Sequence, residues 1–312
     1  MRILVTGATG FVGRAVVARL KTDGHEVVTA ARRHGAGDVF VGDIGPETDW
    51  SNALKNIDAV MHLAARVHVV REHEKDPMAA FWFVNVDGTR QLAEACVKAG
   101  VKRLVFCSSV KAMAERSLPG HPLTEADTPA PETDYGLSKL EAENLLLEIS
   151  ARTGLEVVNV RPPLVHGPGA RGNFLSLLRL CAMRLPLPVK SIANRRSFLH
   201  VDNLADALVL CATHPAAAGE TFLVCDGQAF STPELMEILG RGMGRGQRLF
   251  PFPPALLHGG LRLLGKGEVY EKLCGNLELD DTHLRQTLGW IPPIGPEEGL
   301  LATAKWFAEK RL

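Results

Sequence analysis

The feature that most constrains the fold is the stretch VTGATGFVG, in which three glycines follow a strand-forming segment and open a helical one. The preceding RILV is apolar and β-branched, and the apolar residues of Val12 to Leu20 recur with the period of a helix. Glycines at Gly7, Gly10 and Gly13 permit a tight turn, close approach of the backbone to a diphosphate, and close packing of helix on strand. The start of a helix also favours an anion. The stretch therefore predicts a dinucleotide-binding unit, with contacts from Gly7, Thr9, Gly10, Phe11, Val12 and Gly13.

Short runs rich in β-branched residues alternate with helical segments through the first half of the chain. Six runs are expected to form strands: RILVTG, EVVTAAR, DVFVG, AVMHLAA, RLVFCSS and EVVNVRP. Between most of them lie segments with an apolar 3.6-residue period, such as Asn85 to Ala99. Strands that alternate with helices form a parallel sheet covered on both faces. The predicted fold class is α/β, a Rossmann-type doubly wound parallel sheet.

The composition changes after Pro162, where Pro, Gly and Arg become frequent. This change predicts a smaller C-terminal substrate-binding lobe. The segments SFLHVDNLADALVL and ETFLVC have the pattern of a helix and a strand that return to the first unit. We expect residues 1–165 to form the dinucleotide-binding Rossmann domain, with 198–228 returning to it, and residues 166–197 and 229–312 to form the substrate-binding lobe.

Charge and apolar content restrict the partners and the compartment. Lys and Arg together number 35, as do Asp and Glu, so net charge does not favour nucleic acid or a membrane as the main partner. The six cysteines lack a Cys-x-x-Cys pair and are expected to be buried reduced thiols. Without a signal peptide or a long apolar segment, the protein is expected to be cytoplasmic. For PPALLHGGLRLLG, a packed helix is favoured over an amphipathic helix on a bilayer.

The end of the second expected strand carries two arginines. Many dinucleotide-binding proteins have an acidic residue there that accepts hydrogen bonds from the adenosine ribose, whereas this chain has Ala30 and Ala31 followed by Arg32 and Arg33. A guanidinium forms a forked, charge-assisted pair with a 2′-phosphate that a carboxylate would repel. The sequence therefore favours NADP over NAD. Asp43, after the third strand, is placed to accept from the adenine amino group.

A set of three side chains predicts proton-transfer chemistry. YGLSK places Tyr135 and Lys139 four residues apart, on one face of a helix, and FCSS ends the fifth strand with Ser108 and Ser109. A tyrosine with an ordinary pKa near ~10 is a poor acid or base at neutral pH, but a neighbouring ammonium favours its ionised form. Lys139 can also hold the nicotinamide ribose, while Ser109 orients the substrate oxygen.

The chain resembles the extended short-chain dehydrogenase/reductases, specifically the NAD(P)-dependent nucleotide-sugar epimerase/dehydratase group. TGATGFVG, HLAA, VNVDGT, SS, YGLSK, RPPLVHGPG, RRSFLHVDNLADAL and LGWIPPIGPEEGL occur in the expected order over nearly the whole length. The resemblance implies a catalytic set of Ser109, Tyr135 and Lys139, and substrate contacts at Asn173 and Arg196. It also implies a homodimer through helices of the first unit. Further cofactor contacts are expected at Ile44, Leu63, Ala64, Ala65, Asn85, Tyr135, Lys139 and Pro162.

Three positions depart from the pattern of that group. Dehydratases usually carry an Asp-Glu pair just after the serine or threonine, where this chain has Val110 and Lys111. An ammonium cannot serve as the carboxylate base, so 4,6-dehydration is not expected and Lys111 becomes a candidate contact to the sugar. The aspartate of the RDxIHV motif is replaced by Ser197, which leaves the nucleotide contacts open.

The histidines do not have the spacing of a metal site. His62, His166 and His200 lie in family motifs but far apart, without a nearby cysteine or His-x-x-x-His pattern, so structural roles are favoured and no metal is expected. Arg66 and His68 follow the fourth strand. Loops at the carboxyl ends of parallel strands face the ligand, so these two are candidate substrate contacts, with a solvated loop as the alternative.

The favoured function is an NADP(H)-dependent oxidoreductase that acts at C4 of a nucleotide-linked hexose, most simply the reduction of a UDP-4-keto-6-deoxy-N-acetylhexosamine in surface-polysaccharide biosynthesis. A consumed cofactor is commonly NADPH, which is why the arginines favour reduction. The alternative is a UDP-hexose 4-epimerase, acting on UDP-glucose or UDP-N-acetylglucosamine with bound NAD. A more remote alternative is a non-catalytic NADP(H)-binding redox sensor, which the tyrosine-lysine pair disfavours.

Overall fold

The first part of the chain forms a parallel sheet in the computed structural model, which describes residues 1–67, 76–183, 185–265 and 267–310. Its strands have the order β3-β2-β1-β4-β5-β6-β9, and every pairing is parallel. The order reverses beside β1, which creates a crevice at the carboxyl ends of β1 and β4. The strands are β1 (Arg2–Thr6), β2 (Glu26–Ala31), β3 (Val39–Phe40), β4 (Ala59–His62), β5 (Arg103–Cys107), β6 (Glu156–Arg161) and β9 (Thr221–Leu223).

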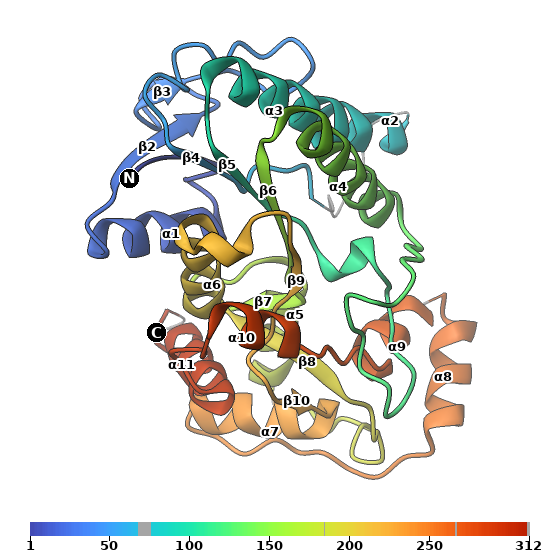
Figure 1. Cartoon of the computed structure of the whole chain (residues 1–312). Coiled ribbons are helices and arrows are strands. Elements are labelled where there is room, and N and C mark those ends of the chain that lie inside the picture. Colours follow the sequence, from blue (N-terminus) through green and yellow to red (C-terminus); the bar gives the residue numbers. More distant parts are fainter. Residues whose placement is uncertain (68–75, 184, 266, 311–312) are drawn as a thin grey trace.

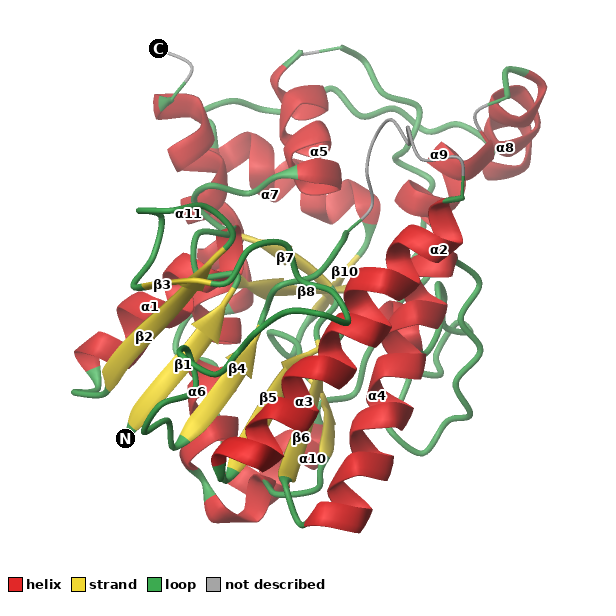
Figure 2. Ribbon diagram, turned by 90° about the horizontal axis from the view of Figure 1, so that it is seen from above, coloured by secondary structure: helices red, strands yellow, loops and turns green. Residues whose placement is uncertain are grey.

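Helices cover both faces of this sheet, as Figures 1 and 2 show. On one face, Ile3 and Val5 pack with α1 (Phe11–Thr22), α6 (Val201–Thr213) and α10 (Thr282–Leu288). On the other face, Leu4 packs with α3 (Gly88–Ala99) and α4 (Asp134–Thr153). Alternate residues of one strand thus enter two cores, which is why the strands lack polar alternation. The predicted Rossmann-type α/β fold is confirmed.

The C-terminal part lies beyond the carboxyl ends of the large sheet (Figure 2). A second sheet has the order β10-β8-β7, and its core includes Phe174, Phe198, Leu239 and Leu300. Its strands and the helices around them are β7 (Leu164–His166), β8 (Arg196–His200), β10 (Ala229–Phe230), α5 (Gly172–Ala182), α7 (Thr232–Gly242), α8 (Pro254–Leu263), α9 (Gly267–Cys274) and α11 (Pro296–Glu309).

Besides α10, a helix and a strand from the later sequence pack with the first sheet and its helices. Helix α6 packs along α1, and β9 pairs with β6 at the sheet edge. The division of the chain into two domains stays a prediction. Short elements complete the described chain: α2 (Pro77–Phe81), the π-helical turn η1 (Trp82–Asp87), and the 3₁₀ turns η2 (Val110–Ala112) and η3 (Pro215–Ala217). No helix in these described ranges is long and apolar enough to cross a membrane.

Candidate active site

The glycine loop has the geometry of a phosphate cradle. Gly7 has φ +68°, and a Cβ there would lie 2.8 Å from the backbone nitrogen of Ala64. A Cβ at Gly13 would collide with the carbonyl oxygen of Gly7. Helix α1 begins after Gly10, and no side chain of the described residues caps it. The first-turn N–H groups are therefore open to an anion, so the loop fits the diphosphate of a dinucleotide.

His62 lies at the end of β4 in a closed chain of hydrogen bonds. The hydroxyl of Thr89 donates to the carbonyl oxygen of Asn85 at 2.7 Å, so it must accept from Nε2 of His62, 3.0 Å away. Nδ1 of His62 then accepts from Thr6 at 2.8 Å. Burial, together with the charge of Lys139, lowers the pKa of His62 to about 3. His62 is thus a neutral structural residue.

The side chain of Asn85 holds the loop after β4 through hydrogen bonds to its backbone. Its side-chain oxygen accepts from the Arg66 N–H at 2.8 Å, and its amide donates to the Arg66 carbonyl at 3.0 Å and to Ser138 at 3.0 Å. Asn85 lies in the π-helical turn η1, a feature that often marks functional sites. Its carboxamide is engaged by protein groups, which supports a role in shaping the cofactor loop. A direct cofactor contact of Asn85 stays a prediction.

Phe81 connects the loop after β4 with the candidate catalytic tyrosine. The guanidinium of Arg66 lies 5.8 Å from the ring centroid of Phe81, and the ring of Phe81 meets that of Tyr135 edge-on, with centroids 6.1 Å apart. Arg66 and Tyr135 are far apart in the sequence but both contact the same aromatic ring. Leu63, Ala64 and Ala65 follow β4 on the same loop and are partly accessible. His68 lies outside the described residues.

Lys139 is almost completely buried and points at the end of β5. Its Nζ donates to the Cys107 carbonyl at 2.8 Å and lies 4.2 Å from the ring centroid of Phe106. Burial lowers the pKa of Lys139 from 10.5 to about 8, against the opposing effects of Cys107 and Glu143. The lysine is therefore charged at neutral pH, and its pKa lies only a little above neutral pH.

Tyr135 and Ser109 face each other across the turn after β5. Burial raises the pKa of the Tyr135 phenol, and a hydrogen bond with the side chain of Ser109 acts in the opposite direction. Ser109 also caps η2, because its hydroxyl accepts from the Lys111 N–H at 3.2 Å. The Val110 N–H donates to the Pro162 carbonyl at 2.9 Å, which ties this turn to the end of β6. The three predicted catalytic residues are thus brought together.

A buried ion pair supports the helix below Lys139. Glu143, one turn farther along α4, accepts from the Arg161 guanidinium of β6 at 2.6 Å and 3.1 Å. The two side chains are 2% and 8% exposed, so both charges depend on each other for solvation. Removing either partner alone would leave a buried charge and disturb the position of α4.

Lys111 and Glu115 form a brace at the mouth of the site. Nζ of Lys111 donates to both carboxylate oxygens of Glu115, at 2.9 Å and 2.7 Å. Glu115 also accepts from Thr133 at 2.9 Å, and Thr133 caps α4. Because Lys111 lies two residues after Ser109 and Thr133 two before Tyr135, this brace links the two catalytic segments. A contact of Lys111 with the sugar stays a prediction.

The other predicted substrate residues lie farther along the chain. The guanidinium of Arg196 donates to the Gly275 carbonyl at 2.9 Å, and burial lowers its pKa while Glu115 opposes that shift. Arg196 thus lies near the Lys111–Glu115 brace. Asn173 is exposed in the first turn of α5. Their substrate contacts are untested predictions.

Both arginines after β2 are exposed. Nε of Arg32 lies 3.5 Å from a carboxylate oxygen of Asp43, with side chains 68% and 82% exposed. Ile44 lies against α3, since a Cβ on Gly88 would collide with its side chain. Arg32, Asp43 and Ile44 are therefore neighbours at the end where an adenosine would lie, but Asp43 screens part of the charge of Arg32.

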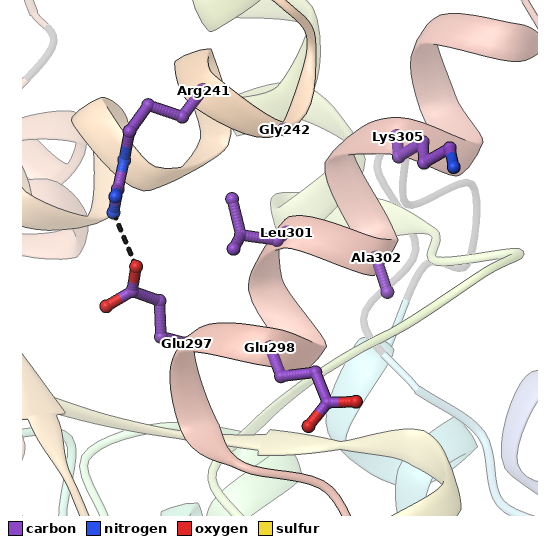
Figure 3. A pocket seen from close by; sticks show the side chains of 7 residues that line it. All are labelled: Arg241, Gly242, Glu297, Glu298, Leu301, Ala302 and Lys305. Carbon is purple, nitrogen blue, oxygen red and sulfur yellow. Dashed lines mark hydrogen bonds and ion pairs between the residues drawn. The ribbon is translucent and has the colours of Figure 1, made fainter.

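A hollow of about 640 Å³ lies elsewhere, between α7 and α11 (Figure 3). Its lining consists of Arg241, Gly242, Glu297, Glu298, Leu301, Ala302 and Lys305. Arg241 donates to Glu297 at 2.7 Å, and Glu298 and Lys305 turn away from that pair. Its polar groups do not converge on a common point, so this hollow is not the candidate active site. Among the described residues, no group of three or more His, Cys, Asp or Glu side chains could hold a metal ion.

Comparison with known proteins decides the family. The model of the NAD dependent epimerase/dehydratase family matches residues 3–225, which include the glycine loop and Ser109, Tyr135 and Lys139. The chain belongs to this family. It is therefore an enzyme of the nucleotide-sugar epimerase/dehydratase group that uses a nicotinamide dinucleotide.

Three relatives show how close the similarity is. The chain is 41% identical to UDP-glucose 4-epimerase of Vibrio cholerae, over 98% of this chain and 95% of the relative. It is 26% identical to the structure of Thermus thermophilus UDP-glucose 4-epimerase in complex with NAD, with TM-score 0.77 and coverage of 98% and 99%. The fold matches UDP-N-acetylglucosamine 4-epimerase of Bacillus cereus, with TM-score 0.80, 22% identity and 99% of both chains.

Several residues that shape this epimerase-family site do not stand out in the sequence. Phe81, Glu115 and Ser138 act through partners far away in the chain, and no spacing rule identifies those partners. Glu143 and Arg161 did carry a signal, because Glu143 lies one helical turn after Lys139 and Arg161 opens the motif RPPLVHGPG. They were not paired from the sequence, because opposite charges on separate elements do not by themselves show which side chains meet.

Proposed function

We propose that this enzyme is a UDP-hexose 4-epimerase that uses Tyr135 as its acid and base. The observation that carries this proposal is the convergence of Ser109, Tyr135 and Lys139 at the carboxyl end of β5. Similarity to UDP-glucose 4-epimerase over almost the whole chain favours epimerisation over the 4-keto reduction that the sequence first suggested. UDP is proposed as the nucleotide on the same ground.

Each residue of the site has a defined task in this reaction. Tyr135 removes the proton of the C4 hydroxyl and returns it after the sugar has turned over. Ser109 hydrogen-bonds to the C4 oxygen, and Lys139 supplies the positive charge that favours the phenolate. The dinucleotide supplies the chemistry of accepting the C4 hydride and giving it back to the opposite face. The sugar leaves with C4 inverted and the oxidation state of every group is restored.

We further propose NADP as the preferred dinucleotide. The end of β2 carries Ala30 and Ala31 and so offers no carboxylate for an adenosine ribose, and the Arg32 and Arg33 that follow are exposed. A guanidinium pair there suits a 2′-phosphate. Because epimerisation returns the hydride to the sugar, an epimerase that binds NADP does not consume NADPH.

One assay separates the two reactions. The protein is incubated with UDP-glucose and UDP-N-acetylglucosamine while 4-epimers are followed by chromatography and cofactor absorbance is recorded. Interconversion without net cofactor loss supports the epimerase, and the Tyr135→Phe variant should abolish it. Stoichiometric NADPH loss with a UDP-4-keto-6-deoxy sugar, and no epimer formed from either hexose, would instead identify a reductase.

A further inference from the structure

Helix α8 (Pro254–Leu263) is attached to the molecule by one side only. No residue of α8 is buried, although Leu257 packs partly against the C-terminal core. Leu256 is 64% exposed and Leu263 91%, and Leu264 just after the helix is 72% exposed. Both overall views place α8 at the margin of the molecule, beside α9 (Figures 1 and 2). Large apolar side chains therefore project from an outlying helix.

The outward face of α8 carries leucines separated by glycines, which have no side chains. Leu256 and Leu263 lie seven residues apart and so project from the same side. Gly259 and Gly260 lie between them, exposed and with open space around them. A helix this short with two glycines has little stability of its own. Its sequence is therefore better suited to a helix whose outer face is covered than to one left in water.

A second group of exposed apolar residues lies at the strap, the segment of residues 248–253 that leads into α8. The N–H of Phe250 donates to the Leu187 carbonyl at 3.0 Å, and the N–H of Lys190 donates to the Phe250 carbonyl at 3.2 Å. This pairing places the segment after α5 beside the strap. Phe250, Met183 and Leu185 are all large apolar residues that are 40% to 59% exposed.

The exposed charged side chains along the strap and α8 are predominantly cationic, although Glu271 of α9 lies 3.8 Å from His258 of α8. Arg248, Arg262 and Lys190 are exposed along the strap and helix. Exposed leucines flanked by exposed cations complement a surface that is apolar inside and negatively charged outside.

We propose that α8 and the strap before it dock on an anionic lipid bilayer, with Leu256 and Leu263 inserted at the boundary between headgroups and acyl chains. Arg248, Arg262 and Lys190 lie against the headgroups. The enzyme is thereby held at the membrane surface by an interfacial helix. Charge complementarity selects a bilayer over a second copy of the chain, whose matching face would present the same cations.

Cosedimentation with vesicles tests the proposal on the full-length protein. The wild type should sediment with vesicles of phosphatidylglycerol and phosphatidylethanolamine in equal parts, and at least 10-fold less with phosphatidylcholine. Leu256→Glu combined with Leu263→Glu should weaken binding to the anionic vesicles by more than about 10-fold. Arg248→Gln with Arg262→Gln should weaken it by roughly fivefold per arginine, and high salt should do the same.

Two controls make the test decisive. Ile291→Glu removes an apolar side chain that is 76% exposed outside α8 and the strap, and should leave vesicle binding unchanged. Sedimentation velocity without lipid then compares the leucine variant with the wild type. Failure of the wild type to bind, equal binding to neutral vesicles, or equal loss in Ile291→Glu would overturn the proposal. So would a leucine variant that dissociates a dimer, because the face would then join two copies of the chain.

Discussion

Lys139 donates a hydrogen bond from Nζ to the carbonyl oxygen of Cys107 at 2.8 Å, and so ties the helix of Tyr135 to the end of β5, two residues before Ser109. The ammonium also lies over the ring of Phe106, and this ring stacks on His62, with centroids 5.8 Å apart. A neutral His62 is required beside this charge. The chain of hydrogen bonds through Thr6 and Thr89 fixes that neutral form.

The pH dependence of turnover should report Lys139. Because burial lowers its pKa to about 8, the ammonium is present below that pH and is lost above it. We expect kcat/KM to fall above about pH 8, as the positive charge that supports the Tyr135 phenolate disappears. In Lys139→Met the residual activity should be much lower and lack that fall. A wild-type profile that stays level to about pH 10, the range of an unperturbed lysine, would contradict this assignment.

Tyr135→Phe should abolish most turnover and leave cofactor binding nearly unchanged. The hydroxyl transfers the proton, whereas the ring keeps its edge-on packing with Phe81. General acid-base catalysis contributes on the order of 10² to 10⁴ in rate. Steady-state rates and a dinucleotide titration on the same preparation provide the measurement. Retention of more than about a tenth of the wild-type rate, with chemistry limiting, would remove Tyr135 from the proposed role.

Cofactor preference should depend on Arg32 and Arg33. A hydrogen bond to a charged group contributes roughly 1.5 to 3 kcal/mol, which corresponds to a preference for NADP over NAD of about 10-fold to 150-fold. The Arg32→Ala, Arg33→Ala double variant should bind NADP and NAD with similar affinity. Asp43→Asn should raise the preference for NADP, because the carboxylate 3.5 Å from Arg32 no longer screens its charge. Equal wild-type affinities for the two dinucleotides would refute the proposal.

His62 should make the protein sensitive to acid. Its pKa is about 3 in the folded protein, below the 6.5 of an ordinary histidine, so the unfolded state binds more protons between these values and stability falls as the pH falls from 6.5 towards 3. From pH 7 to pH 5 this linkage amounts to about 2 kcal/mol. The His62→Gln variant can still hydrogen-bond to Thr6 and Thr89. Its free energy of unfolding should fall less than that of the wild type between pH 7 and pH 5. Urea unfolding of both proteins at the two pH values measures the difference, and equal losses would exclude it.

Local sequence rules were sufficient to predict strands β1 to β6, the glycine loop and the tyrosine-lysine pair. They did not predict the second sheet, in which SFLH, expected to open a helix, forms most of β8. Each predicted feature depends on residues close together in the chain: the alternation of strand and helix, the turn at Gly7, or the i, i+4 spacing of Tyr135 and Lys139. The surroundings of Asn85 and Lys111 could not be predicted. Asn85 is held by Arg66 and Ser138, and Lys111 by Glu115, through contacts that form only after the sheet has brought separate loops together.

The helix expected for PPALLHGGLRLLG is present and packs on one side only, where His258 contacts Tyr270 of α9. Leu257 does pack partly against the C-terminal core, but no residue of α8 is buried and Leu263 stays 91% exposed. A hydrophobic period in the sequence shows that a helix has an apolar side, but not whether the rest of the chain covers that side.

The Lys111–Glu115 brace gives the last prediction. Lys111→Met and Glu115→Gln each remove one side of the link between the turn of Ser109 and the cap of Tyr135's helix. Each should lower kcat about 10-fold, roughly 1.4 kcal/mol, without altering dinucleotide affinity. The double variant should be no worse than either single one, because the same link is broken in all three. Arg116→Gln breaks the exposed Arg116–Glu132 pair of the same loop and should have little effect. If Glu115→Gln keeps wild-type activity while Lys111→Met loses it, then Lys111 acts on the sugar directly and not through the brace.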